Sequence, residues 1–220
     1  TRNENKNEKT NERKQGIVVE HVYKSFGKEQ VLVDVNLEIP PGKIYGVVGN
    51  NGSGKTVLMK CICGFMHPDK GQIHVGGIRI GKECDFPDKL GVIIETPGFL
   101  PGLSGYKNLK ILADLKGRIG KNEIIQTLQR VGLNPKMKKP VSKYSLGMRQ
   151  RLGIAQAIME NPDVLILDEP FNGLDKAGVA EMRQLLLSLK ESGKAIMLAS
   201  HNAQDIEMLC DCVHEMEDWK

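Results

Sequence analysis

GNNGSGKT, residues 49–56, joins the apolar run KIYGVV to a stretch with the composition of a helix. Its three glycines permit positive φ angles and close backbone approach, so successive N–H groups can face phosphate oxygens. The helix that follows would add its positive N-terminal end. Lys55 can reach the β and γ phosphates, and the Thr56 hydroxyl can take a coordination position on Mg²⁺. The stretch therefore predicts a P-loop for a nucleoside triphosphate. Its predicted nucleotide-binding residues are Gly49, Asn50, Asn51, Gly52, Ser53, Gly54, Lys55, Thr56 and Val57.

A second apolar run, VLILDEP at 164–170, supplies two carboxylates. Ligands of open α/β sheets gather at the carboxyl ends of the strands, so Asp168 and Glu169 are expected near Lys55. Asp168 is placed to hold Mg²⁺, directly or through water. Glu169 can polarise a water for in-line attack. The other interpretation, that the two acids cap a helix, explains less because both halves of a two-part catalytic site are present.

Composition limits the classes of function. The chain of 220 residues is 40% hydrophobic and 26% charged, which is typical of a globular protein. Its formal net charge is only +4, so charge does not indicate a nucleic-acid partner. No apolar run approaches the roughly 20 residues that span a bilayer, and residues 1–16 lack the apolar region of a signal peptide. We therefore expect a cytoplasmic protein that reaches the membrane only through another protein.

The order of elements predicts the fold class. Residues 1–15 are polar and charge-mixed, which predicts a disordered tail, and one α/β domain is expected over 16–220. VLVDVNLEIP and GQIHVGGIRI indicate an antiparallel β subdomain, the second as a hairpin turning at Gly76-Gly77. Residues from about 100 to 160 have helical periodicity and predict an inserted helical subdomain, with Leu109, Leu112 and Leu115 on one stripe. Strands then alternate with helices, which predicts a mostly parallel sheet.

The five cysteines invite a metal interpretation that the spacing does not favour. Cys61 and Cys63 fall in an expected helix, where positions i and i+2 point to different sides. Cys210 and Cys212 have no neighbouring histidine at zinc-site spacing. Reduced, buried structural thiols are the better interpretation.

The segment YSLGMRQRLGIAQAI decides between classes of P-loop protein. Ser145 is a candidate N-cap for an amphipathic helix. The segment resembles the signature sequence LSGGQ of ATP-binding cassette proteins, with Ser145 and Gly147 matching and Leu146 and Met148 departing. A serine hydroxyl and a helix N-terminus can still face a γ-phosphate. Over about residues 16–218, the chain is similar to an ATP-binding cassette (ABC) ATPase.

The resemblance implies roles for three further residues. Phe26, in KSFGK, occupies the place of the aromatic ring that stacks on adenine; a core phenylalanine is the other interpretation. Asp175, in NGLD, matches the loop that contacts the partner subunit. His201, in ASHN, matches the switch histidine that contacts the γ-phosphate. Together with Lys55 and Glu169, His201 is therefore expected to be catalytic.

Glu95 departs from the family pattern. LGVIIETPGF has glutamate where the family usually has a glutamine that senses Mg²⁺, the attacking water and the membrane partner. The added negative charge implies tighter Mg²⁺ binding or a different geometry. The expected metal ligands are Thr56, Glu95 and Asp168. IIE-x-P-x-F followed by SLGM is similar to the export ATPases of the bacitracin- and lantibiotic-resistance type.

The resemblance also implies partners and a mechanism. Two cassettes, identical or paired, would sandwich ATP and Mg²⁺ head to tail, and a membrane permease would respond to the closure, with the chain at the inner face of the cell membrane. Two alternatives stay open: a soluble cassette acting in translation or DNA maintenance, and a module that holds ATP without hydrolysis. The single P-loop and the absence of room for a long coiled coil disfavour the first, and Glu169 with His201 disfavours the second.

Overall fold

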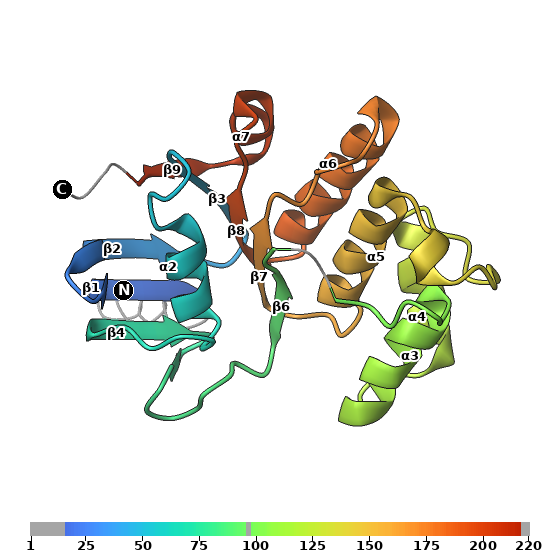
Figure 1. The fold of residues 1–220 in the computed structure, drawn as a ribbon, viewed down its shortest axis with the longest axis horizontal. Coiled ribbons are helices and arrows are strands. Elements are labelled where there is room, and N and C mark those ends of the chain that lie inside the picture. The colour runs from blue at the N-terminus through green and yellow to red at the C-terminus, as the bar shows by residue number, and fades with distance from the viewer. Residues whose placement is uncertain (1–15, 96–97, 217–220) are drawn as a thin grey trace, which may run out of the picture.

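The computed structural model describes residues 16–95 and 98–216, and Figure 1 shows their arrangement. The predicted tail, residues 1–15, lies outside the described residues. Two sheets and a group of helices succeed one another across the view. The fold is the predicted α/β class.

An antiparallel sheet forms from the first part of the chain. Its strands run in the order β2-β1-β4-β5. Their bounds are Ile17–Phe26 (β1), Glu29–Ile39 (β2), Lys70–Val75 (β4) and Ile78–Arg79 (β5). The predicted hairpin is confirmed, because Val75 pairs with Ile78 across Gly76-Gly77. The alternating apolar residues of β2 are buried as expected, on the side of the sheet that faces the core.

A parallel sheet forms the centre of the molecule. Its order is β6-β7-β8-β3-β9, and every pairing in it is parallel. The bounds are Lys43–Val48 (β3), Leu90–Ile93 (β6), Val164–Asp168 (β7), Ala195–Ala199 (β8) and Cys212–Glu215 (β9). Every residue of β8 is buried, and β7 is buried up to Asp168. Such continuous apolar runs are typical of strands covered on both faces.

Helix α2, Lys55–Ile62, lies between the two sheets and carries the phosphate loop at its N-terminal end (Figure 1). Leu58, Met59, Cys61 and Ile62 are buried on it and belong to the apolar core that both sheets share. This burial fixes the helix, and therefore the loop, against the carboxyl end of β3. It also confirms the buried-thiol interpretation for Cys61 and Cys63.

The segment 100–160 is helical, as predicted. Its elements are α3 (Gly105–Lys116), α4 (Lys121–Arg130), the 3₁₀ turn η1 (Val141–Lys143) and α5 (Leu146–Ile158). Leu109 is buried and Leu112 is partly buried, whereas Leu115, predicted on the same stripe, is 78% exposed. Leu115 stands in the last turn of α3, the end that projects beyond the neighbouring helices in Figure 1.

Two helices complete the described chain: α6 (Lys176–Glu191) and α7 (Ala203–Leu209). Figure 1 shows α6 beside β7 and β8, and α7 next to β8 and β9. No helix among the described residues combines the length and the apolar character needed to cross a membrane.

The cysteines at the carboxyl end differ from the expectation. Cys210 is partly buried, but Cys212 is exposed. The reason is that β9 is the edge strand of the parallel sheet. Within residues 16–95 and 98–216, no three His, Cys, Asp or Glu side chains gather where they could hold a metal ion.

Candidate functional site

The phosphate loop turns from β3 into α2 through glycines that other residues could not replace. Gly54 has a φ of 94°, and a Cβ there would lie 2.9 Å from the Val31 carbonyl oxygen. At Gly49 a Cβ would lie 2.6 Å from Ser53 Oγ. The turn therefore requires glycine for backbone conformation and for space. Asn50, Asn51 and Gly52 are exposed along it, Ser53 is buried, and Val57 packs against the core beneath the loop.

Lys55 curls back over this loop. Its Nζ donates to the carbonyl oxygens of Gly49 at 2.6 Å and Asn50 at 2.8 Å, and it lies 3.4 Å from Ser53 Oγ. An ammonium group held over backbone that ends at a helix N-terminus is a site for phosphate oxygens. The loop geometry fits the triphosphate that the sequence predicts.

Asp168 faces the same helix from the carboxyl end of β7. The Thr56 hydroxyl donates to Asp168 Oδ2 at 3.3 Å. Burial raises the pKa of the Asp168 carboxyl above its ordinary value, and the charges of Glu169 and Glu95 raise it further. Lys55 near Asp168 and Lys60 at Glu95 offset only part of this negative charge. The hydroxyl and carboxylate oxygens, with this surplus of negative charge, fit Mg²⁺, which prefers oxygen ligands and completes its shell with water and phosphate.

Glu169 follows Asp168 with its backbone in the left-handed region, at a φ of 48°. Such a conformation costs a non-glycine residue roughly 1 kcal/mol or more and concentrates at functional sites. Three hydrogen bonds hold its backbone: the Glu169 amide donates to Ala199 O at 2.9 Å, and Glu169 O accepts from Gln150 Nε2 and from the Asn172 amide, both at 3.2 Å. The side chain is turned away from the strand direction, toward the loop after β8.

His201 is in that loop and contacts Glu169 directly. Its backbone amide donates to Glu169 Oε1 at 2.9 Å, and its Nδ1 lies 2.8 Å from the same oxygen. The His201 side chain is 76% exposed, so its other ring nitrogen is open to a ligand. The structure therefore brings Lys55, Thr56, Asp168, Glu169 and His201 to one edge of the parallel sheet.

Glu95, two residues after the end of β6, is paired with a residue that the sequence analysis missed. Its Oε1 accepts a hydrogen bond from Lys60 Nζ of α2 at 2.6 Å. Glu95 also has a positive φ, 60°. The extra negative charge of glutamate is thus compensated locally, so its part in metal binding stays a prediction. The only signal for this pair in the sequence is the extra negative charge of Glu95, which favours a nearby basic residue.

Ser145, Gly147 and Asp175 form a separate surface. Ser145 Oγ accepts from the Met148 amide at 3.1 Å, which confirms the predicted N-cap of α5. Asp175 Oδ1 accepts from the Gly178 amide at 2.9 Å and caps α6. A Cβ at Gly147 would lie 2.7 Å from the Gly173 carbonyl oxygen, so the start of α5 packs closely against the loop that precedes α6. They border a hollow of about 470 Å³.

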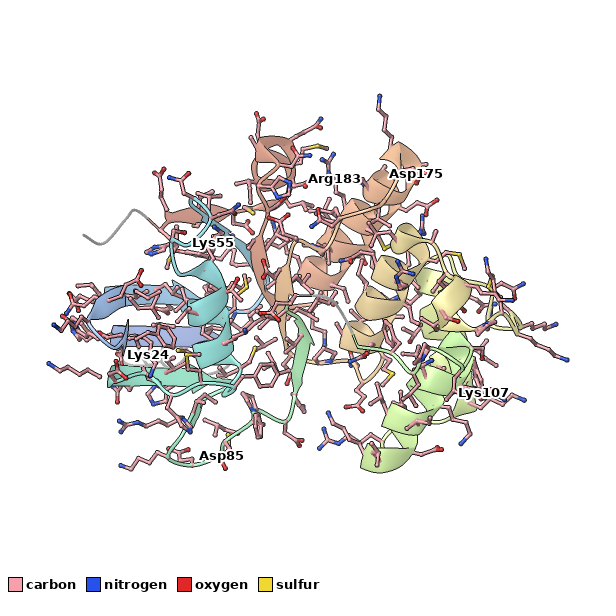
Figure 2. The ribbon with its side chains drawn as sticks, in the orientation of Figure 1. Lys24, Lys55, Asp85, Lys107, Asp175 and Arg183 are labelled. Atoms are coloured by element: carbon pink, nitrogen blue, oxygen red, sulfur yellow. The ribbon has the colours of Figure 1, made fainter. Side chains whose placement is uncertain are left out.

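This second surface lies away from the first within one chain. Figure 2 shows Asp175 at the start of α6 and Lys55 over α2, on different parts of the molecule. Phe26, at the end of β1, is 47% exposed, which excludes the core interpretation; its stacking on adenine stays a prediction. Lys24 Nζ lies 5.8 Å from the centroid of the Phe26 ring.

Comparison with known proteins places this geometry in context. Residues 32–172 match the family described as ABC transporter. The chain is 44% identical over 204 residues to the bacitracin transport ATP-binding protein BcrA of Enterococcus faecalis, covering 92% of this chain and 66% of that protein. It is 41% identical to the lantibiotic transport ATP-binding protein SrtF of Streptococcus pyogenes, covering 89% of this chain and 84% of the relative.

A solved structure shares the fold. It is the dimeric structure of a post-hydrolysis state of an ATP-binding cassette bound to ADP and Pi, with a TM-score of 0.82. The alignment covers 92% of this chain and 94% of that one, at 23% identity.

Proposed function

Because the chain belongs to the ABC transporter family, we propose that this ABC ATPase is the ATP-hydrolysing subunit of a membrane exporter for a peptide antibiotic or a similar amphiphile. The observation that carries the ATPase part is the meeting of Lys55, Asp168, Glu169 and His201 at one sheet edge. The cargo class rests on the bacitracin and lantibiotic relatives. The chain spans 66% of the length of the BcrA relative, so the proposal concerns the cassette.

The ATP site of the proposal uses both surfaces. The phosphate loop and Lys55 would hold the β and γ phosphates, and Phe26 would stack on the base. Thr56 and Asp168 would hold Mg²⁺, which when bound neutralises phosphate charge. Figure 2 shows Asp175 and Lys55 on different parts of the molecule, and Ser145 and Gly147 line the same hollow as Asp175. These three residues would instead meet the nucleotide of a second cassette, an arrangement that a head-to-tail dimer provides.

Hydrolysis would follow from the Glu169–His201 contact. Glu169 would accept the proton of the attacking water, and His201 would hold the carboxylate in position by its amide while its exposed ring faces the γ-phosphate. The backbone conformation at Glu169 sets this orientation before the substrate arrives. ATP would favour the closed pair of cassettes only through contacts that the open pair lacks.

The permease contact is proposed for the region between β6 and the helical segment. A groove of about 250 Å³ lies between the start of β6, the end of α3 and the end of α5. Leu115 borders it and is the most exposed of the large apolar side chains there. A cytoplasmic segment of a permease could bury this side chain, which would place the chain at the inner face of the cell membrane.

The test of the transporter proposal is affinity capture of the tagged full chain from detergent-solubilised native membranes, followed by mass spectrometry. We expect a multi-span membrane protein to be recovered with the chain. A Leu115→Glu variant should recover less of it, while Ile111→Glu, an exposed change on the same helix outside the groove, should not. Recovery of ribosomal or DNA-associated proteins instead would overturn the transporter proposal and favour the soluble-cassette alternative.

A further inference from the structure

A buried ion pair connects α6 with α7, the helix that follows His201. Arg183, labelled in Figure 2, donates through Nε to Asp205 Oδ1 at 2.9 Å, and its terminal Nη2 also contacts that oxygen. The side chains are 12% and 3% exposed, respectively. A pair this buried requires its remaining polar atoms to be satisfied, because leaving either charge unpartnered is costly.

The second oxygen of Asp205 reaches the residue next to His201. Ser200 Oγ donates to Asp205 Oδ2 at 3.0 Å, and both groups are buried. The same Ser200 oxygen accepts from the Asn202 amide at 3.2 Å. This hydroxyl therefore links the residues on either side of His201 to Asp205. Asn202 is held in addition as the N-cap of α7, where its Oδ1 accepts from the Gln204 amide at 3.0 Å.

The histidine itself has few other restraints. Its ring is exposed, and its backbone amide and its Nδ1 both contact Glu169 Oε1. The loop 200–202 must therefore take its position from its flanks and from that carboxylate. Without the Ser200–Asp205 contact, the His201 amide would hold Glu169 from a less ordered loop.

We infer that Asp205, held by Arg183, is a positioning residue for His201 and ties the switch loop to helix α6. The inference rests on the proposed ATPase function. Asp175, the N-cap of helix α6, lies on the surface proposed to meet the second cassette. A shift of α6 when the cassettes close would therefore move Arg183, Asp205 and Ser200 together, and so set the loop that carries His201. The ion pair acts through Ser200 and touches no substrate atom.

The experiment compares Ser200→Ala, Asp205→Asn and a control. Ser200→Ala removes the connection and leaves the Arg183–Asp205 pair intact, so it should fold even if Asp205→Asn does not. The control is Lys190→Met. It breaks another ion pair of α6, in which Lys190 Nζ lies 2.8 Å from Asp211 Oδ1, about two helical turns after Arg183. We expect the two site variants to lower kcat about tenfold while the KM for ATP changes less than about twofold, and the control to keep its kcat.

Two readouts separate positioning from general destabilisation. In a His201→Ala background, Ser200→Ala should cause little further loss, because the two residues act as one unit. Hydrogen exchange should quicken at the amides of 200–202 and stay unchanged in β8. An equal loss with and without His201, or faster exchange throughout β8, would overturn the inference. If the wild-type chain binds no ATP, the proposed function fails, whereas the exchange result still decides the positioning role.

Discussion

A single carboxylate oxygen, Glu169 Oε1, lies 2.9 Å from the His201 backbone nitrogen and 2.8 Å from its Nδ1. Glu169 directly follows β7 and His201 follows β8, and the two strands are neighbours in the parallel sheet. The contact therefore depends on the sheet order and not on proximity in the sequence. It leaves Oε2 of Glu169 available for a water.

Glu169→Gln should abolish most turnover and keep ATP binding. The amide is close in size to the carboxylate and can still accept from the His201 amide, but it cannot take a proton from water. We expect kcat for phosphate release to fall by about 10² or more, in the range that general-base loss produces, with the ATP-induced rise in melting temperature retained. Near-normal hydrolysis would refute Glu169 as the base.

Lys55→Ala should lose nucleotide affinity. The Lys55 ammonium group donates to the Gly49 and Asn50 carbonyl oxygens and would supply a charged hydrogen bond to phosphate. A charged hydrogen bond contributes about 1.5–3 kcal/mol, so the Kd for ATP should rise roughly 10- to 100-fold. Titration with a fluorescent ATP analogue measures it. Lys110→Ala, which breaks an exposed pair with Asp114 on α3, is the control. Unchanged binding by the Lys55 variant would count against the phosphate site.

The sequence predicted most of the site because each half of it is a local pattern. A strand, a glycine-rich loop and a helix place Lys55, and an apolar strand ending in two acids places Asp168 and Glu169. Contacts that join distant elements carry no such pattern. Neither the Lys60–Glu95 pair nor the Arg183–Asp205–Ser200 connection follows from spacing, because each depends on how α2 faces β6 or α6 faces α7. Leu115 shows the same limit. Periodicity predicted which face of the helix it lies on, but not that no neighbouring element covers that face at its position.

The Lys60–Glu95 pair should tune Mg²⁺ dependence. Lys60→Met would leave the Glu95 carboxylate uncompensated near Asp168, so the Mg²⁺ concentration for half-maximal hydrolysis should fall by about two- to fivefold. Glu95→Gln should raise it by a similar factor. The pair is partly exposed, so high salt should shrink both effects. An Mg²⁺ titration at fixed ATP tests this, and identical curves for the wild type and both variants would contradict it.

Cysteine reactivity should follow burial. Burial raises the pKa of the Cys61 thiol to about 11 and that of Cys63 to about 12. The thiolate is the reactive form, so neither should react at neutral pH while the chain is folded. Exposed Cys212 should be labelled first by a maleimide, and Cys212→Ser should remove this fast phase. Peptide mapping identifies the sites. Rapid labelling of Cys63 in the folded protein would contradict the burial of α2 between the sheets.

His214 should make the fold less stable in mild acid. Its Nε2 is buried on β9 without a hydrogen-bond partner among the described residues, and burial lowers the pKa of its imidazole. Above the ordinary pKa of about 6.5, the ring is uncharged in both the folded and the unfolded state, so its ionisation does not change the free energy of unfolding there. As the pH falls below that value, the unfolded chain takes up the proton first, and stability is lost until the folded-state pKa is reached. Urea unfolding of His214→Leu at pH 7.5 and pH 5.5 should show a smaller difference between the two values than the wild type does. His67→Leu, which changes an exposed histidine, is the matched control. An equal loss of stability in acid for the wild type and His214→Leu would show that the proton is taken up elsewhere.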